Sequence, residues 1–364
     1  MSSKKIKRRD FLTKTSLLAG ATGLSLPNIA RAQSKRRLKM VTTWPKNFPG
    51  FGTSCEALAR RVKLMSKGSL EIKIYAAGEL VGAFEAYDAV STGAADMYHA
   101  AEYYWQGKSP AFNFFTAVPF GMTPQEINAW IYWGGGQTLW DELSSRFNIR
   151  SFLCGNSGMQ MGGWFNREIN RIEDFRGLKI RIPGLGGELL HRHGALAVSL
   201  PGGEIFPSMK SGAIDATEWV GPWNDLAFGL YQVAKFYYWP GFHEPGPAIS
   251  AGINLESWQS LSTEHQEILR TAMEAENNKM YTEYEYRNAV SLKILTEKHN
   301  VKLRRFSPEI LKTLKKTSEE ILEEIGSHDN ISHKIYKSFR ENMARSKEWT
   351  KISSIAYYQT RDGE

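Results

Sequence analysis

Extended and helical stretches alternate in the first part of the chain. Residues 71–75 alternate polar and apolar side chains, which is the pattern of a strand with one buried face. Residues 54–65 instead repeat apolar side chains at helical spacing, and Gly68 follows the last of them. The other predicted elements of this part are strands over 38–44 and 96–99 and a helix over 83–90. Strand–helix–strand units of this length predict a mostly parallel sheet with helices on both faces.

A second series of the same kind begins near Arg150. Helices are predicted over 187–193 and 205–210. The strands and extended stretches around them are predicted over 149–155, 161–169, 178–182, 197–200 and 213–219. We therefore predict two α/β lobes of comparable size, with a boundary near Gly155 and a return of the chain to the first lobe over 247–254.

The last third of the chain is mostly helical. Residues 263–266 fit a capping box, from which a helical pattern continues to His299. Residues 301–306 alternate like a strand, and the next helix, from Ser307 to 326, ends at a glycine. The tail then keeps adding aromatic residues, at Tyr336, Phe339, Trp349, Tyr357 and Tyr358. We expect so apolar a tail to cover a surface, either on its own body or on a second subunit.

The composition is that of an ordinary globular protein. Of the 364 residues, 42% are hydrophobic and 23% are charged, which excludes disordered, collagen-like and small disulfide-rich proteins. Two cysteines, Cys55 and Cys154, are too few for a cysteine-rich metal site, and we predict two buried free thiols rather than a bridge. The formal net charge is +8, but residues 1–32 hold seven basic residues and one acidic residue. Because the remainder is nearly neutral, we predict no nucleic-acid partner.

The first 32 residues fit an export signal. Arg8-Arg9 precedes Phe11-Leu12, a weakly apolar run follows, and residues 30–32 (Ala-Arg-Ala) are typical of a cleavage site before Gln33. Paired arginines of this kind are typical of the twin-arginine route, which carries folded proteins across the inner membrane. A basic tail or an uncleaved anchor is the alternative, but the run is too short and too polar to span a bilayer. We therefore predict a periplasmic protein.

Common catalytic motifs are absent from the sequence. It contains no G-x-S-x-G, no H-E-x-x-H, no P-loop and no G-x-G-x-x-G. Residues 134–136 are three glycines that fit a join between two helices rather than a phosphate loop. His191 and His193 lie two positions apart on a predicted helix and so point to different faces, which does not suit a shared metal.

Polar residues stand instead at the ends of several predicted strands. Arg181 ends one strand, and Glu218-Trp219 ends the next long one. Glu244 lies in the aromatic loop over 238–246, and Gln160 follows a glycine-rich turn at the lobe boundary. Each residue alone has a structural explanation, as a salt bridge or a solvated loop side chain. Ligands bind at the carboxyl ends of strands in open α/β sheets, so one cation, two carboxylates and one carboxamide together indicate a binding cleft.

Four segments carry a resemblance to a known family, namely residues 161–165, 175–181 (Phe-Arg-Gly-Leu-Lys-Ile-Arg), 212–219 and the loop over 238–246. They resemble the extracytoplasmic solute receptors of TRAP (tripartite ATP-independent periplasmic) transporters, and the resemblance covers nearly all of the chain after the signal. Gln160, Glu218-Trp219 and residues 243–246 are similar to the branch that binds 2-oxo acids and lactate. The resemblance implies a two-lobed α/β periplasmic binding protein with hinged mixed sheets and a helical C-terminal region. It implies a receptor, not an enzyme, that delivers a small 2-oxo or 2-hydroxy monocarboxylate, such as pyruvate or lactate, to a TRAP permease.

The same resemblance divides the chain into five parts. We expect a signal peptide (1–32), a first lobe (33–155), a second lobe (156–247), a return to the first lobe with helices packing across both lobes (248–326), and a helical extension (327–364). In some relatives such an extension pairs two subunits as a homodimer.

The resemblance also implies how the acid is held. Arg181 would grip the carboxylate with its planar guanidinium in two parallel hydrogen bonds. Tyr103 and Tyr104 would reach the acid from the other lobe and exclude water, and Gln160 is a further substrate contact.

A metal ion is implied as well. Glu218, the Trp219 main-chain carbonyl, Glu244 and Gln160 are hard oxygen donors, which suit a Ca²⁺ or Na⁺ that bridges the substrate carboxylate. Counting charges, Ca²⁺ leaves the cleft neutral and Na⁺ leaves one negative charge, which slightly favours Ca²⁺ and leaves both ions open.

Three other functions stay open on the sequence alone. One is an organic-acid receptor of another transporter class without a metal. Another is an exported enzyme acting on small carboxylic acids, against which the missing nucleophile–base pair and cofactor loop argue. The third is a ligand-sensing partner of a membrane kinase.

Overall fold

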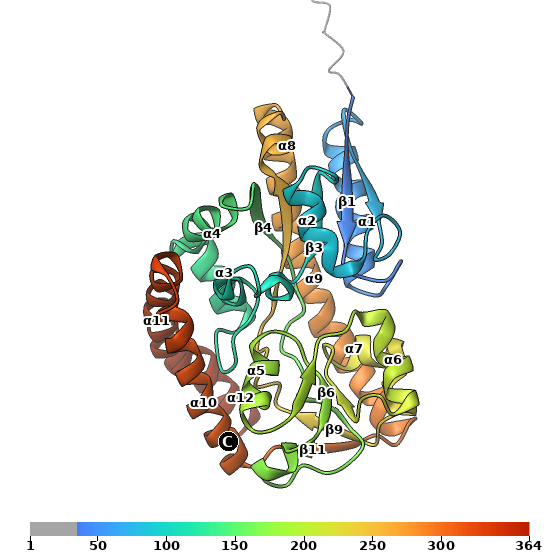
Figure 1. The fold of residues 1–364 in the computed structure, drawn as a ribbon, viewed down its shortest axis with the longest axis vertical. Helices are drawn as coiled ribbons and strands as arrows, with labels where there is room; N and C mark the ends of the chain where they lie inside the picture. Colours follow the sequence, from blue (N-terminus) through green and yellow to red (C-terminus); the bar gives the residue numbers. More distant parts are fainter. Residues whose placement is uncertain (1–34, 364) are drawn as a thin grey trace, which may run out of the picture. The chain divides into compact units, whose positions relative to one another are not determined.

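Two β-sheets surrounded by helices make up residues 35–363, which the computed structural model describes (Figure 1). Residues 1–34 and 364 lie outside the described residues, and so does the expected twin-arginine signal. The first sheet has the strand order β2–β1–β3–β10–β4, and the second has the order β11–β9–β5–β8–β6–β7. Two sheets of this kind confirm the predicted two-lobed α/β fold.

The first sheet comprises β1 (Arg36–Thr42), β2 (Leu70–Tyr75), β3 (Met97–Ala100), β4 (Ile149–Asn156) and β10 (Ala248–Asn254). Its part of the chain includes α1 (Phe51–Met65), α2 (Ala86–Ser91), α3 (Pro124–Trp133), α4 (Gly136–Ser145), α8 (Leu255–Gln259) and the short helices η1 (Ala83–Glu85), η2 (Glu102–Trp105) and η3 (Pro110–Phe115). β1 pairs in parallel with β2 and β3, whereas β10 runs antiparallel between β3 and β4. The sheet is therefore mixed rather than mostly parallel, because the chain leaves it through β4 and returns through β10.

The second sheet comprises β5 (Gly163–Phe165), β6 (Lys179–Arg181), β7 (Leu196–Val198), β8 (Ala216–Thr217), β9 (Phe236–Trp239) and β11 (Lys302–Arg305). Its helices are α5 (Gly184–Arg192), α6 (Gly202–Ser211), α7 (Pro222–Phe228) and the short η4 (Ile172–Phe175) and η5 (Leu230–Gln232). β6 lies parallel to β7 and β8, while β5 runs antiparallel to β8 and β9. The strand expected over 213–219 has only two paired residues, Ala216 and Thr217, and the next residue, Glu218, is buried.

One helix accompanies both lobes. α9 (Thr263–Glu297) has 35 residues, which corresponds to about 52 Å. It packs against α1 and β4 of the first lobe and against α7 of the second. Its N-cap is Ser262, whose hydroxyl accepts a hydrogen bond from the His265 amide, so the capping box expected over 263–266 was placed one residue late.

The C-terminal helices pack on the rest of the same chain before they end at an exposed tail. α10 (Pro308–Gly326) contacts α5, and α11 (Asn330–Thr350) contacts α3, α4 and η3. The tail of this chain, η6 (Lys351–Ile355) and α12 (Ala356–Asp362), has no fully buried side chain. The predicted covering of the body is thus confirmed for α11, while the last aromatics stay exposed.

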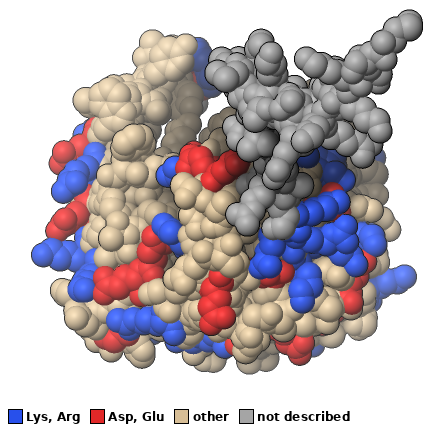
Figure 2. Space-filling view, turned by 90° about the horizontal axis from the view of Figure 1, so that it is seen from above, with Lys and Arg blue, Asp and Glu red and all other residues tan. Residues whose placement is uncertain are grey.

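Other features of the chain agree with its sequence. Within residues 35–363, Cys55 and Cys154 are free and buried. The described helices include none that is long and apolar enough to cross a membrane. Figure 2 shows basic and acidic side chains interspersed over much of the described part of one face, as expected for a nearly neutral body.

Candidate functional site

Neighbouring strands of the second sheet bring two of the predicted site residues together. Arg181 is the last residue of β6 and pairs in register with Thr217, the last residue of β8, so the next residue, Glu218, lies at the same edge. Because parallel strands end on the same side of a sheet, the two oppositely charged side chains meet there.

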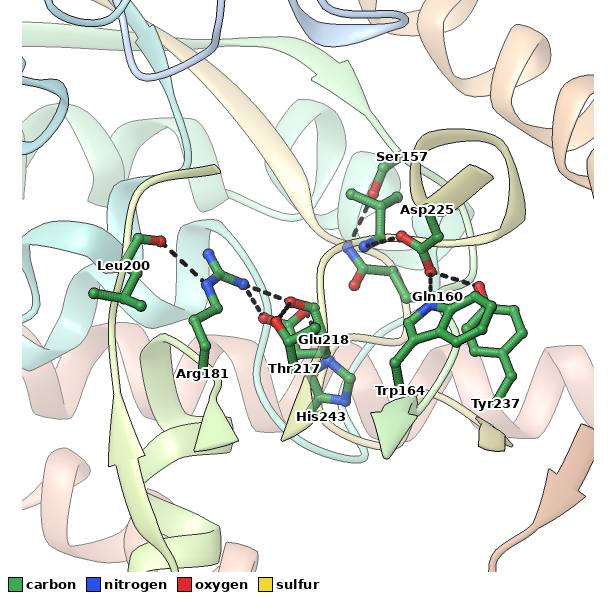
Figure 3. A network of polar contacts seen from close by, with 11 residues as sticks. Ser157, Gln160, Trp164, Arg181, Leu200, Thr217, Glu218, Asp225, Tyr237 and His243 are labelled. Atoms are coloured by element: carbon green, nitrogen blue, oxygen red, sulfur yellow. Dashed lines mark hydrogen bonds and ion pairs between the residues drawn. The ribbon is translucent and has the colours of Figure 1, made fainter. Parts of the chain in front are cut away.

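Arg181 and Glu218 form a buried ion pair, and each is only 1% exposed (Figure 3). One guanidinium nitrogen, Nη1, donates to the Glu218 main-chain oxygen at 2.9 Å and also contacts the Glu218 carboxylate oxygen Oε1. Nε donates to the Leu200 carbonyl at 3.1 Å, and the guanidinium carbon lies 5.1 Å from the centre of the Trp219 ring. Burial is the largest influence and opposes the positive charge, but Glu218, Tyr104, Tyr103 and Glu244 together raise the pKa of Arg181 above its usual value.

The loop after β9 places a histidine and a second glutamate beside this pair. His243 Nε2 lies 3.3 Å from the other Glu218 oxygen, Oε2. Glu218, His243 and Glu244 offer ligand atoms within 4.8 Å of one another, and all three are buried. Sequence reasoning did not assign His243 to the site, although its position next to Glu244 in an aromatic loop was the available signal.

Gln160 reaches the same site from the segment between the lobes. Its main-chain oxygen lies so close to Gly241 that a Cβ there would be 2.4 Å away, so the loop that carries Glu244 needs a glycine at this contact. The Gln160 amide nitrogen donates to the Ser157 hydroxyl at 3.2 Å, and the Gln160 side chain lies near Glu244, where it partly opposes the rise in the pKa of that carboxyl. The structure therefore brings Gln160, Arg181, Glu218 and Glu244 together.

Tyrosines from the first lobe lie across the site. Tyr103 and Tyr104 belong to η2, directly after β3, and their rings contact each other edge to face at 4.9 Å. Tyr103 lies near Glu244 of the second lobe, where it partly opposes the rise in the pKa of that carboxyl. Both tyrosines line a 230 Å³ cavity together with residues of the second lobe, among them Pro183 and Gly184. The two lobes thus meet at this site.

Ionisation at the site is shaped by burial. Burial and then the charge of Glu218 raise the pKa of Glu244 well above its usual value. Burial and then Glu244 raise the pKa of Tyr103 well above its usual value, and burial raises the pKa of Tyr104 to about 12. Both tyrosines therefore keep their protons and can donate hydrogen bonds to an anion.

Several buried polar atoms of the site have no hydrogen-bond partner in the described part of the chain. Two are oxygens, Gln160 Oε1 and Glu244 Oε2, and two are N–H donors, Arg181 Nη2 and Trp219 Nε1. An unpaired buried polar atom costs about 1–3 kcal/mol. Hard carboxylate and amide oxygens fit Ca²⁺ or Na⁺, and guanidinium and indole donors fit an anion. The donor set therefore suits a cation and a carboxylate together.

A second polar network supports the loop that carries Glu218 and Trp219. The Asp225 carboxylate accepts hydrogen bonds from Trp164 Nε1 at 2.9 Å, from the Tyr237 hydroxyl at 2.6 Å and from the Val220 amide at 3.4 Å (Figure 3). Burial raises the pKa of Asp225 to about 7. This network fixes the backbone just after the site residues.

His191 and His193 do not share a site. His193 Nε2 lies 3.1 Å from the Thr317 hydroxyl, whereas His191 lines the 230 Å³ cavity. The triad of Glu218, His243 and Glu244 is the one cluster of potential metal ligands among the described residues.

Comparison with known proteins shows the family to which the chain belongs. Residues 40–329 match the family described as bacterial extracellular solute-binding protein, family 7. The chain is 39% identical to a monocarboxylate 2-oxoacid-binding periplasmic protein of Nostoc sp., over 97% of this chain and 98% of that protein.

Crystal structures of similar proteins hold ions and small acids. A TRAP periplasmic solute-binding protein from Pseudoalteromonas atlantica, with bound sodium and pyruvate, has a TM-score of 0.87 and 39% identity over 90% of this chain and 99% of that one. One from Colwellia psychrerythraea, with bound calcium and pyruvate, has the same TM-score and identity over 90% of this chain and all of that one. One from Bordetella bronchiseptica, a dimer with copurified calcium and picolinate, has a TM-score of 0.89 and 32% identity over 91% of this chain and 98% of that one.

Proposed function

Because the chain belongs to family 7 of the bacterial extracellular solute-binding proteins, we propose that it is the periplasmic receptor of a TRAP transporter for a small 2-oxo or 2-hydroxy monocarboxylate. Pyruvate is the first substrate to test, since two similar proteins were crystallised with it. The observation that carries the proposal is the buried Arg181 beside unpartnered oxygens of Gln160 and Glu244. A guanidinium for the carboxylate next to hard donors for a cation is what a small acid bridged by an ion requires.

We assign the contacts as follows. Arg181 binds the substrate carboxylate, with Gln160, Tyr103 and Tyr104 as further contacts. Glu218, the Trp219 carbonyl, Glu244 and Gln160 would hold Ca²⁺ or Na⁺, which would supply positive charge for the acid. The tyrosine hydroxyls exclude water and donate to the acid.

Closure of the two lobes follows from where these residues lie. Arg181, Glu218 and Glu244 belong to the second lobe, so the acid meets that lobe first. Tyr103 and Tyr104 then arrive from the first lobe, and the Tyr103–Glu244 contact belongs to the closed arrangement. The acid favours closure only through the contacts that it gains there. The closed shape is what a permease would recognise as loaded.

Calorimetry of the mature protein tests this function. Pyruvate and lactate should bind in buffer with Ca²⁺ or Na⁺, and binding should weaken strongly after chelation in sodium-free buffer. Undiminished binding without cations would exclude the bridging ion and favour a metal-free receptor of another class. If no monocarboxylate binds under any of these conditions, the proposed function is wrong.

A receptor returns its ligand unchanged, which separates it from an exported enzyme. We expect pyruvate and lactate to persist in NMR spectra during long incubation with the pure protein. Consumption of either acid would identify an enzyme.

We also propose export by the twin-arginine route, since Arg8-Arg9 precedes Phe11-Leu12. Replacing both arginines by lysine should leave the protein in the cytoplasmic fraction of the producing cells, whereas periplasmic recovery of that variant would refute the route.

A second copy of the chain is the partner that we propose for the exposed tail. Trp349 is 67% exposed and Ile352 is 71% exposed, although the preceding helix is anchored on its own lobe. A 610 Å³ cavity between α3, β4 and α9, with the 90% exposed Trp133 in its lining, is the surface that we assign to the partner's tail. A similar protein was crystallised as a dimer.

Light scattering tests this pairing. A chain that ends after Thr350 keeps the packed α11 intact, and so does Ile352→Glu. Both should have about half the particle mass of the wild-type dimer, as expected for monomers, and so should Trp133→Glu. An unchanged mass in all three would refute pairing through this tail.

A further inference from the structure

The buried pair of Arg181 and Glu218 occupies both groups that the proposed function assigns to ligands. Nη1 of Arg181 is held by the Glu218 carboxylate and main-chain oxygen, and Nε is held by the Leu200 carbonyl. Within residues 35–363, only Nη2 of this guanidinium lacks a partner. A carboxylate bound through two guanidinium nitrogens therefore has to displace one of the present acceptors.

Glu218 is occupied to the same degree. One of its carboxylate oxygens contacts Arg181, and the other lies 3.3 Å from His243 Nε2. A cation that takes Glu218 as a ligand competes with these neighbours for the negative charge of its carboxylate, even though each oxygen has a further lone pair. His243 has a second ring nitrogen, Nδ1, that finds no partner among the described residues, so the ring holds Glu218 through a single contact.

Breaking a buried ion pair on one side only is far less favourable than exchanging both partners. If the acid alone took Arg181, Glu218 would stay behind as a buried charge without its partner. If the cation alone took Glu218, Arg181 would be left in the same condition. Entry of both ligands leaves every buried charge paired.

We propose that the Arg181–Glu218 pair makes acid and cation binding mutually dependent through partner exchange. The acid takes Arg181 from Glu218, and the cation takes the released Glu218. The pair holds the site closed to either ligand alone. This inference rests on the proposed function, and by linkage each ligand strengthens the binding of the other by the same factor.

The exchange makes a prediction that direct bridging by the ion does not. Bridging alone means that Glu218→Asp, which keeps the negative charge, weakens or leaves unchanged the binding of pyruvate. Exchange means that weakening the pair frees Arg181, so pyruvate binds better in the absence of cations. The wild-type protein, Glu218→Gln and Glu218→Asp should therefore be compared by calorimetry in chelated, sodium-free buffer and in Ca²⁺ buffer.

In the absence of cations, Glu218→Gln should bind pyruvate at least about tenfold more tightly than the wild type, since one charged hydrogen bond no longer competes for Arg181. Its enhancement by Ca²⁺ should be at least tenfold smaller than that of the wild type. Glu218→Asp keeps the negative charge but falls short of Nη1, so it should gain cation-free affinity in the same direction by a smaller factor. A gain in the aspartate variant separates release of Arg181 from mere loss of negative charge.

A matched buried carboxylate elsewhere provides the control. Glu276 of α9 lies 2.7 Å from the Arg61 guanidinium in the first lobe and is nearly as buried as Glu218. Glu276→Gln should leave the cation-free affinity and the Ca²⁺ enhancement at wild-type values, since that pair lies apart from the proposed contacts.

The outcomes separate the two proposals. If the wild type binds pyruvate with Ca²⁺ but neither variant of Glu218 gains cation-free affinity, the exchange is wrong and the receptor function stands. A gain in Glu218→Gln without one in Glu218→Asp also overturns the exchange, because repulsion then explains the result. If the wild type binds no acid with any cation, both proposals fail. Should Glu218→Gln not fold, judged by its thermal melt, the aspartate variant decides alone.

Discussion

The buried carboxylate of Asp225 should make the protein more stable as the pH falls from about 7 to about 4. The side chain is 1% exposed and is held by Trp164, Tyr237 and the Val220 amide. Burial raises its pKa from 3.8 to about 7. Between these two values the folded protein binds a proton that the unfolded chain does not, so stability is highest at the acidic end and is lost as the pH rises.

The size of this effect follows from the displacement of the pKa. Roughly three pKa units at about 1.4 kcal/mol each give about 4 kcal/mol across the window. Asp225→Asn carries no titrating proton, so the difference in unfolding free energy between wild type and variant should change by about that amount between pH 4 and pH 7. As the pH falls, the unfolding free energy of the wild type should rise relative to that of the variant. Above pH 7.5 the difference between the two should be constant.

Urea unfolding at half-unit steps of pH measures the difference directly. The exposed surface carboxylate Asp88, which pairs with Lys108, supplies the control variant Asp88→Asn, which keeps Asp225 and should keep the gain in stability toward acid. Parallel curves for wild type and Asp225→Asn would show that Asp225 is ionised throughout the window, and the reasoning from burial would be refuted.

Three further outcomes can be tested on the same protein. Arg181→Met should lower pyruvate affinity by about two to three orders of magnitude and destabilise the fold by about 3–5 kcal/mol, because it leaves Glu218 buried without its partner. Calorimetry measures the affinity and thermal melts measure the stability. The control Arg192→Met, at a more exposed ion pair, should change neither quantity. Tyr103→Phe should release pyruvate about tenfold faster in stopped-flow experiments, because it removes one donor from the closed lobe; an unchanged release rate would place its hydroxyl away from the acid. Burial raises the pKa of both thiols, so Cys55 and Cys154 should react with a thiol reagent only after unfolding, and labelling of the native protein would contradict their burial.

The sequence predicted the site residues that lie at the ends of strands. Arg181 and Glu218 follow hydrophobic strands that end in the same direction, so their meeting at one sheet edge could be predicted from pattern alone. Their direct ion pair could not be predicted, because the sequence shows that the two charges are opposite but gives no distance between them. His243 was missed for the same reason, since its ring enters the site through the fold of a loop.

Pairing between strands that lie far apart in the sequence could not be predicted either. The alternation over 301–306 predicted a strand, but nothing in it indicates that β11 pairs with β9, more than sixty positions earlier in the chain. The antiparallel placement of β10 between β3 and β4 likewise depends on how the chain crosses between lobes. The cap at Ser262 differs from the expected one by a single residue, as is common for helix ends.

The length of α9 restricts how the receptor can move. A continuous rod of 35 residues that touches both halves is much stiffer than the loops that cross beside it. We therefore expect the two lobes to rotate about α9 rather than slide along it, which restricts their relative motion to one direction. Small shifts around a bound acid would then become larger displacements at the outer ends of the two lobes.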